Sequence, residues 1–171
     1  MSAMTDEPRS GCPINAAVEV LGDRWSPIVL RDVMFGDRRH FRRLLTESEE
    51  GIASNILAGR LRSLVEAGLL TRDKAKRGQR APYSLTEPAI QLVPVMAQLA
   101  AWGLRHRPTT HELRVRAEVL EAGGPELWAD LMDELRERHL GIPRPDTARP
   151  AATDQLNAAY AAAVTEPRRS D

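Results

Sequence analysis

The sequence predicts a mainly α-helical fold that carries one small β-hairpin. Two observations predict it. Apolar side chains recur at helical spacing through most of the 171 residues, and around residues 69–85 this repeat gives way to two short segments on either side of a basic turn. A chain of this length can bury one compact core without needing a second domain.

Three short helices are expected first. Each ends where a glycine-aspartate pair or a polar turn interrupts the apolar repeat. Proline is tolerated in the first turn of the second helix, which has Ile28, Val29, Val33 and Met34 as its apolar face. The expected ranges are Pro13–Leu21, Trp25–Phe35 and His40–Leu45.

A longer helix is predicted from about Ala53 to Ala67. Its apolar face consists of Leu57, Leu61, Leu64 and Val65. Gly68 follows directly and supplies the left-handed residue that commonly ends a helix. One face of this helix is expected to pack on the core, and the opposite face is free to contact a partner.

The hairpin is expected to pair residues 69–75 with residues 82–85. Its turn, Lys76-Arg77-Gly78-Gln79-Arg80, has glycine at the tip and cations on both sides. A helix-turn-helix followed by such a hairpin is a winged helix-turn-helix, and a basic wing can contact a phosphate backbone.

The sequence beyond the hairpin exceeds what a minimal winged helix needs. Helices are predicted at Pro88–Arg107, Thr110–Ala122 and Glu126–Leu140, with a break at Gly123-Gly124-Pro125. The expected organisation is a flexible N-terminus (1–10), a winged-helix domain (11–107), a helical extension (108–140) and a linker with a weakly ordered, alanine-rich helical tail (141–171).

The extra N- and C-terminal helices are expected to form a dimer interface or to cover an effector pocket. An apolar helix on a small domain must bury the row of apolar side chains on its face. Packing of these helices within one chain would also bury it and is the alternative. The candidate residues for the interface or pocket are Trp25, Met96, Leu99, Trp102 and Trp128.

The charge is unevenly distributed although the net charge is zero. Residues 22–107 hold 15 Lys and Arg against 9 Asp and Glu, giving +6, whereas the flanking segments carry −2 and −4. A basic centre is expected if that part meets DNA. Aromatic residues make up only 4% of the chain, which favours duplex DNA over single strands bound by stacking.

Other classes of protein find little support in the sequence. There is no phosphate-binding glycine loop and no nucleophile motif with a credible base, so an enzyme is not expected. The four histidines are too scattered to predict a metal site, and no cofactor is expected. One cysteine, no apolar run of about 20 residues and no secretion signal predict a cytoplasmic protein without membrane contact.

A set of short motifs carries a family resemblance, specific in its order and spacing. The motifs are Cys12-Pro13, Leu21–Trp25, Ile28–Arg31, Arg39–Phe41, Gly51–Ala53, Leu57, Arg60-Leu61, Leu64, Gly68–Leu70 and Tyr83–Thr86. With them the chain resembles the HxlR family of bacterial winged-helix regulators, relatives of the MarR type, over about Gly11 to Arg107. The resemblance implies a homodimer on a pseudo-palindromic operator, usually as a repressor and sometimes as an activator.

The start of the long helix is expected to contact base edges in the major groove. Asn55 can form a bidentate pair with adenine, Ser54 can either contact a base or cap the helix, and Ala58 can meet a thymine methyl. Gly59 offers no side chain to a base, in contrast to the longer polar residue common in the family.

Basic residues are expected to contact phosphates and to make binding salt-dependent. Arg77 and Arg80 are expected at the minor groove. The alternative for each cation is solvation or a surface ion pair, and Arg60 is the best candidate for an internal pair. The full predicted set is Arg38, Arg39, Arg42, Arg43, Arg60, Arg62, Lys76, Arg77 and Arg80.

Cys12 is a candidate sensor of oxidants or electrophiles, since the resemblance implies sensing at this position in some members. The helix that follows Pro13 could lower the pKa of the thiol. Inert packing of a small apolar side chain is the alternative. The sequence thus predicts a DNA-binding dimer responding to a redox or small-molecule signal, with a protein-contact winged helix as the alternative.

Overall fold

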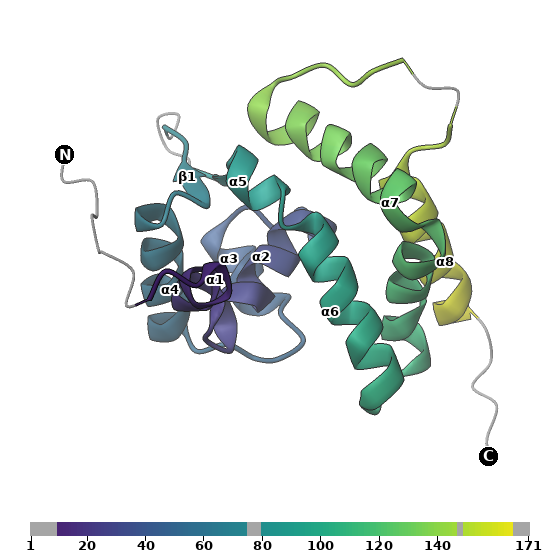
Figure 1. The fold of residues 1–171 in the computed structure, drawn as a ribbon, viewed down its shortest axis with the longest axis horizontal. Coiled ribbons are helices and arrows are strands. Elements are labelled where there is room, and N and C mark those ends of the chain that lie inside the picture. Colours follow the sequence, from purple (N-terminus) through teal and green to yellow (C-terminus); the bar gives the residue numbers. More distant parts are fainter. Residues whose placement is uncertain (1–9, 75–79, 147–148, 166–171) are drawn as a thin grey trace. The chain divides into compact units, whose positions relative to one another are not determined.

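A computed structural model describes residues 10–74, 80–146 and 149–165 of the chain (Figure 1). The chain divides into two compact units, residues 1–83 and 84–171, and each is described by itself. The prediction of a mainly helical fold with one two-stranded sheet is confirmed, and the wing is formed by β1 and β2.

In its described residues, the first unit contains four helices followed by the start of the sheet. The helices are α1 (Pro13–Leu21), α2 (Trp25–Gly36), α3 (Phe41–Thr46) and α4 (Ser54–Glu66). Strand β1 (Leu70–Arg72) pairs with β2 (Tyr83–Leu85), which runs from the first unit into the second. Both strands are shorter than the sequence predicts.

The core of the first unit lies between α2, α3 and α4. Leu57, Leu61 and Leu64 of α4 are each at most 1% exposed, as their helical spacing predicts. Val65 is 37% exposed, so its assignment to the apolar face of α4 is wrong. The other buried members are Val29, Leu30, Val33, Met34 and Leu44.

The end of α4 is fixed by Gly68, as expected. Its φ of 72° is left-handed, and two hydrogen bonds close the helix: Gly68 N–H to the Val65 carbonyl at 3.0 Å and Leu69 N–H to the Leu64 carbonyl at 2.9 Å. This is a Schellman motif. It ends α4 abruptly and allows the chain to turn directly into β1.

The second unit is helical after the last residues of β2. It contains α5 (Glu87–Ile90), α6 (Val93–His106), α7 (His111–Leu140) and α8 (Ala152–Thr165). The prediction of one helix over Pro88–Arg107 is wrong, because α5 stops at Ile90 and α6 begins at Val93. Pro94 lacks a backbone N–H and its ring would clash with the carbonyl four residues earlier, so a continuous helix cannot pass.

Helix α7 bends at the predicted break. Gly124 has φ 57° and ψ −155°, and Pro125 follows it. The indole N–H of Trp128 donates to the Leu120 carbonyl at 2.7 Å and thereby joins the two halves across the bend. The expected helices Thr110–Ala122 and Glu126–Leu140 therefore form one element with a kink.

Helix α8 packs beside α7 (Figure 1). It is held more firmly than the weakly ordered helical tail that the sequence predicts. The buried carboxylate of Glu134 in α7 accepts hydrogen bonds from the backbone N–H of Ala152 and, at 3.1 Å, from that of Thr153. These are free donors at the start of a helix. Ala152, Leu156 and Ala163 are buried, so α8 docks by an apolar face as well as by its cap.

None of the helices within the described residues is long and apolar enough to span a membrane.

Candidate nucleic-acid interface

Helix α4 presents its N-terminal turn to solvent. The residue that precedes the helix is Ala53, and Ser54 and Asn55 are both exposed at its first two positions. No side chain caps this end, so the alternative role of Ser54 as the helix cap is wrong. The two predicted base readers are therefore accessible.

One arginine of α4 anchors the helix to the start of α2. Arg60 forms an ion pair with Asp23 at 3.3 Å. Asp23 also accepts hydrogen bonds from the backbone N–H groups of Trp25 and Ser26, at 2.8 and 2.9 Å. The expectation that Arg60 pairs internally agrees with this contact.

An ion-pair network with one buried member, Asp32, joins α2 to the turn before α4. Arg31 binds Glu50 through two hydrogen bonds of 2.6 and 2.8 Å, and its other contact is Asp32 at 2.7 Å. Asp32 is only 4% exposed and also pairs with Arg38 at 3.0 Å. A buried carboxylate of this kind needs its cationic partners, since an unpaired charge in the interior is costly.

The network extends to α3 through Glu47. Arg43 donates to both carboxylate oxygens of Glu47, at 2.9 and 3.0 Å, and Arg38 lies 3.5 Å from the same group. Glu47 and Glu50 thus neutralise arginines rather than interact with the start of α4. Arg38 and Arg43, both predicted to contact phosphates, are ion-paired within the chain.

The pKa values of these carboxyls follow the pairing. The hydrogen bonds from Arg43 lower the pKa of Glu47, and those from Arg31 lower the pKa of Glu50, in each case against a smaller opposing effect of desolvation. Burial raises the pKa of Asp23, but the hydrogen bonds from Ser26 and Trp25, with the charge of Arg60, outweigh it and the pKa is lowered. The carboxylates are thereby held in their charged form.

Arg39 connects the approach to α3 with the wing. Its guanidinium donates to the Tyr83 carbonyl at 3.1 Å and lies 3.4 Å from Asp73, while its own carbonyl accepts from Tyr83 N–H at 2.7 Å. Arg39, which the sequence predicts to contact a phosphate, therefore also joins the strands to the segment before α3.

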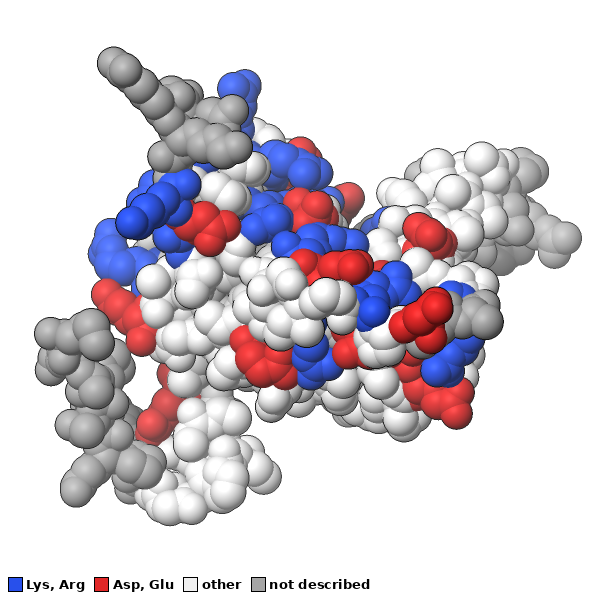
Figure 2. All heavy atoms as spheres, turned by 90° about the horizontal axis from the view of Figure 1, so that it is seen from above, with Lys and Arg blue, Asp and Glu red and all other residues white. Residues whose placement is uncertain are grey.

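The remaining predicted arginines are exposed and unneutralised. Within the part of the chain that the structure describes, Arg42, Arg62 and Arg80 form no ion pair, and all three are exposed. Lys76 and Arg77 lie outside the described residues. Figure 2 shows the Lys and Arg side chains of the first unit gathered in a blue group at the left of the view, with acidic side chains among them.

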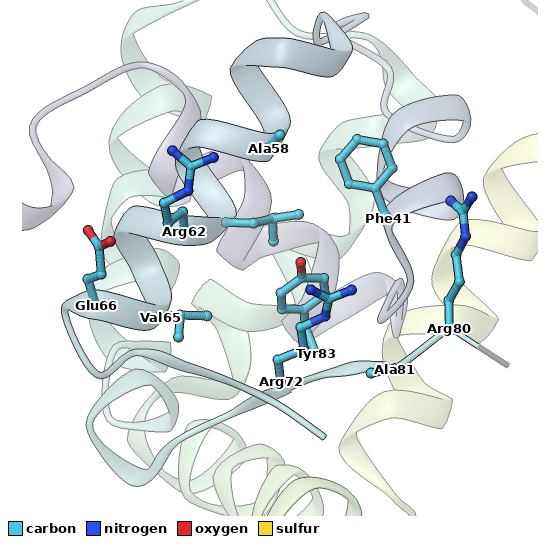
Figure 3. A pocket seen from close by; sticks show the side chains of 10 residues that line it. Phe41, Ala58, Arg62, Val65, Glu66, Arg72, Arg80, Ala81 and Tyr83 are labelled. Carbon is cyan, nitrogen blue, oxygen red and sulfur yellow. The ribbon is translucent and has the colours of Figure 1, made fainter. Parts of the chain in front are cut away.

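Two of these arginines line a cavity of about 560 Å³ between α3, α4 and the strands. Figure 3 shows Arg62 reaching out from α4, Arg72 beside the Tyr83 ring, and Arg80 on the far side near Phe41. The complete lining is Phe41, Ala58, Leu61, Arg62, Val65, Glu66, Arg72, Arg80, Ala81 and Tyr83. The exposed face of α4 and the base of the wing thus share one concave surface.

Arg72 and Tyr83 of this lining are missed by the sequence analysis. Arg72 ends β1, where the first strand residue is buried and the next two are exposed. Its guanidinium carbon lies 5.8 Å from the centre of the Tyr83 ring, within cation–π range. A basic residue at the exposed end of the first hairpin strand is the signal for Arg72, whereas the predicted wing contacts lie in the turn alone.

The predicted pocket or interface residues are divided between the units. Trp25 belongs to the first unit, where Arg24 lies 4.9 Å over its ring, and the other four belong to the second. Leu99 and Trp102 are 55% and 53% exposed on α6, whereas Met96 and Trp128 are half-buried. Neither the cavity at α4 nor a hollow of about 420 Å³ between α7 and α8 is lined by any of the five.

Cys12 directly precedes α1 and is exposed. Helix α1 buries none of its side chains, and Ile14 and Val18 are 75% and 54% exposed. The inert-packing alternative for Cys12 requires a buried side chain, which this chain by itself does not provide.

Among the described residues, no group of three or more His, Cys, Asp and Glu side chains could hold a metal ion.

The helix pair α3 and α4, with β1 and β2 behind it, defines a winged helix-turn-helix protein. The model of the family described as HxlR-like helix-turn-helix matches residues 20–111, more than half of the chain. The chain belongs to this family, which is one of helix-turn-helix transcriptional regulators and not of enzymes. The family resemblance predicted from the sequence motifs is confirmed.

Relatives support the same assignment. An uncharacterized HTH-type transcriptional regulator of Mycobacterium tuberculosis is 36% identical over 99 residues, which are 57% of this chain and 61% of the relative. The Bacillus subtilis regulator YdeP is 29% identical over 60% of this chain and 80% of its own length. The chain therefore spans less than two thirds of the mycobacterial relatives that it matches.

A solved structure has a similar fold. The crystal structure of PA1607, a proposed transcription factor, superposes with a TM-score of 0.55 at 32% identity, covering 61% of this chain and 72% of that one.

Proposed function

We propose that the protein is a transcriptional regulator that binds double-stranded DNA with α4 in the major groove and the wing on the flanking backbone. The observation that supports this most directly is the division of α4: Leu57, Leu61 and Leu64 are buried, while Ser54, Asn55 and Arg62 are exposed. The buried stripe fixes the helix, and the exposed face offers polar groups to base edges and a cation to phosphates. Membership of a helix-turn-helix family supports the same function.

The regulator acts as a homodimer on a pseudo-palindromic operator. Two faces supply apolar surface for the second copy, namely Ile14 and Val18 on α1 and Val95, Leu99 and Trp102 on α6. Exposed apolar side chains clustered on a helix are typical of protein interfaces. A two-fold dimer places two copies of α4 in successive major grooves. Sedimentation velocity tests this: Leu99→Glu is expected to give monomers, and Gln98→Glu, an exposed neighbour, is the control.

Repression of an adjacent gene in the bacterial cytoplasm is the simplest regulatory consequence, because a dimer on an operator within a promoter blocks polymerase. The signal is a redox or small-molecule one, and Cys12 is the proposed sensor. An exposed thiol is open to sulfenic acid formation, a mixed disulfide or a bridge between subunits.

The decisive experiment measures binding to DNA upstream of the protein's own coding region, titrated in salt, with and without a thiol oxidant. The protein is expected to bind the upstream DNA more tightly than random duplex. The affinity is expected to fall steeply as the salt concentration rises. Oxidant is expected to change the affinity of the wild type and to leave Cys12→Ser unchanged. A response that persists in Cys12→Ser removes Cys12 from the sensing role.

Absence of binding to any duplex contradicts the proposed function and leaves the protein-contact alternative, in which the cations meet an acidic protein.

A further inference from the structure

The cavity between α4 and the strands concentrates arginines that no carboxylate neutralises. Arg62, Arg72 and Arg80 line it, against the single carboxylate of Glu66, so its lining carries three positive charges and one negative. Within the described residues, none of these three arginines forms an ion pair, in contrast to Arg38, Arg43 and Arg60 elsewhere in the unit. The positive charge of this lining therefore exceeds its negative charge.

The side chains come from three different elements and line different sides of the cavity. Arg62 stands one helical turn after Ala58 on α4, Arg72 ends β1, and Arg80 precedes the buried Ala81 on the returning segment (Figure 3). Arginines on separate elements around one cavity give its whole lining a positive character, and Arg72 lies between the other two in this view.

Tyr83 gives the site a defined geometry. Its ring lies 5.8 Å from the Arg72 guanidinium carbon, and its backbone is held by Arg39 through hydrogen bonds of 2.7 and 3.1 Å. A guanidinium stacked on an aromatic face loses less freedom when it binds a second group at its edge. Arg72 is therefore oriented in advance, unlike an arginine at the tip of a loop.

We infer that this cavity is a phosphate site, that its occupant is a backbone phosphate of the bound DNA, and that Arg72 is a DNA-contacting residue oriented by Tyr83. The inference rests on the proposed function and assigns a new residue to it. A planar guanidinium binds a phosphate through two parallel hydrogen bonds, which suits a phosphodiester wedged between the recognition helix and the wing. Such a contact fixes the depth and register of α4 in the groove without selecting a base.

The test compares the salt dependence of duplex binding for the wild type, Arg72→Ala and Arg72→Lys. Arg72→Ala is expected to reduce the slope of log K against log salt by about one and to weaken binding to operator and random duplex alike, by about tenfold. Arg72→Lys retains the charge but not the two parallel N–H donors of the guanidinium. It is therefore expected to keep most of the salt slope and to bind duplex about threefold more weakly.

The matched control is Arg116→Ala in the second unit. Arg116 is also stacked on a tyrosine, with its guanidinium carbon 4.3 Å from the Tyr160 ring centre, and it lies outside the cavity. Its removal deletes the same charge and the same kind of stacking. It is expected to leave the slope unchanged, and an equal fall in both variants overturns the inference.

A second arm separates backbone phosphate from a free phosphate ligand. DNA binding is measured in sodium phosphate and in sodium chloride of equal ionic strength. Equal weakening in both salts supports the DNA backbone as the occupant. Stronger displacement by phosphate from the wild type, but not from Arg72→Ala, assigns the cavity to a free anion and overturns the inference.

The two failures are distinguishable. If the wild type binds no duplex, the proposed function fails. If the wild type binds tightly and Arg72→Ala, folded by circular dichroism, binds with the same affinity and slope, only the phosphate site fails.

Discussion

The arginines of α2, α3 and the loop between them and the arginines around the cavity belong to the same compact unit but differ in their partners. Arg31, Arg38 and Arg43 are bound to Asp32, Glu47 and Glu50 at 2.6–3.5 Å. Arg62, Arg72 and Arg80 have no carboxylate partner among the described residues. The first group joins the helices of the helix-turn-helix to one another, and the second group is the one that we propose contacts DNA.

This difference explains why net charge is a poor guide to a binding surface. Residues 22–107 carry a net charge of +6, yet several of their cations are consumed by internal pairs. A paired arginine contributes little to the field that attracts DNA, because its partner cancels it at short range. The position of the unpaired charge, rather than the total, locates the surface.

The largest effect is expected from breaking the buried end of the network. Asp32→Ala removes a carboxylate that is 4% exposed and leaves Arg31 and Arg38 without their shared partner. The free energy of unfolding is expected to fall by about 2–3 kcal/mol, as for other charge-paired groups with limited solvent access.

Urea unfolding followed by circular dichroism measures this loss. Glu49→Ala is the control, since Glu49 is an exposed carboxylate beside Glu50 in the turn before α4 and forms no ion pair among the described residues. Equal stability of the two variants contradicts a structural role for the network.

The sequence predicted those features that depend on local spacing. The buried stripe of α4, its end at Gly68 and the bend at Gly124 follow from periodicity and glycine positions. The break before α6 is also a local feature, because Pro94 in the sequence is enough to predict it.

Pairing between distant residues could not be predicted. Arg31 and Glu50 are separated by 19 residues, and Glu134 and Thr153 by the same number. Such contacts depend on how helices pack, and a sequence of alternating charges permits many pairings of similar free energy. The ion pairs of Arg38, Arg39 and Arg43 within the chain were therefore not predicted, and neither was the place of Arg72 in the lining of the cavity.

The second largest effect concerns base recognition by α4. Asn55→Ala is expected to reduce the preference for operator over random duplex by about tenfold, because a bidentate contact to adenine is worth about 1–3 kcal/mol. Its salt slope is expected to stay constant, in contrast to that of Arg72→Ala. Competition binding with both duplexes measures the ratio. Ser63→Ala, on the same helix with its hydroxyl on the Gly59 carbonyl, is the control, and equal losses on both duplexes contradict the assignment.

A pH titration of stability tests the ion pairs of the first group of arginines without a substitution in them. Glu47 and Glu50 have pKa values below their ordinary 4.5, so their pairs stabilise the folded state fully above that pH and less as the pH falls through the lowered values. Stability is therefore expected to decline below about pH 4.5. Glu50→Gln is expected to flatten this decline, and an unchanged profile in that variant assigns the acid sensitivity to other carboxyls.

The smallest effect on stability is expected from Arg43, at the exposed end of the network. The same variant gives the most direct comparison of a paired with an unpaired arginine. Arg43 is 47% exposed and pairs with Glu47 one helical turn away, so the pair is screened by solvent. Arg43→Ala is expected to lower the melting temperature by less than about 3 °C. Arg62→Ala is expected to lower the salt slope of DNA binding by about one. Arg43→Ala is expected to change that slope far less.

Both substitutions remove one arginine from the exposed surface of a helix in the helix-turn-helix, so only the partner differs. If Arg43→Ala lowers the slope as much as Arg62→Ala, then the Arg43–Glu47 pair opens on DNA and internal pairing does not withdraw an arginine from the interface. If the slopes differ as expected, a carboxylate one turn away is sufficient to decide which cations DNA can use.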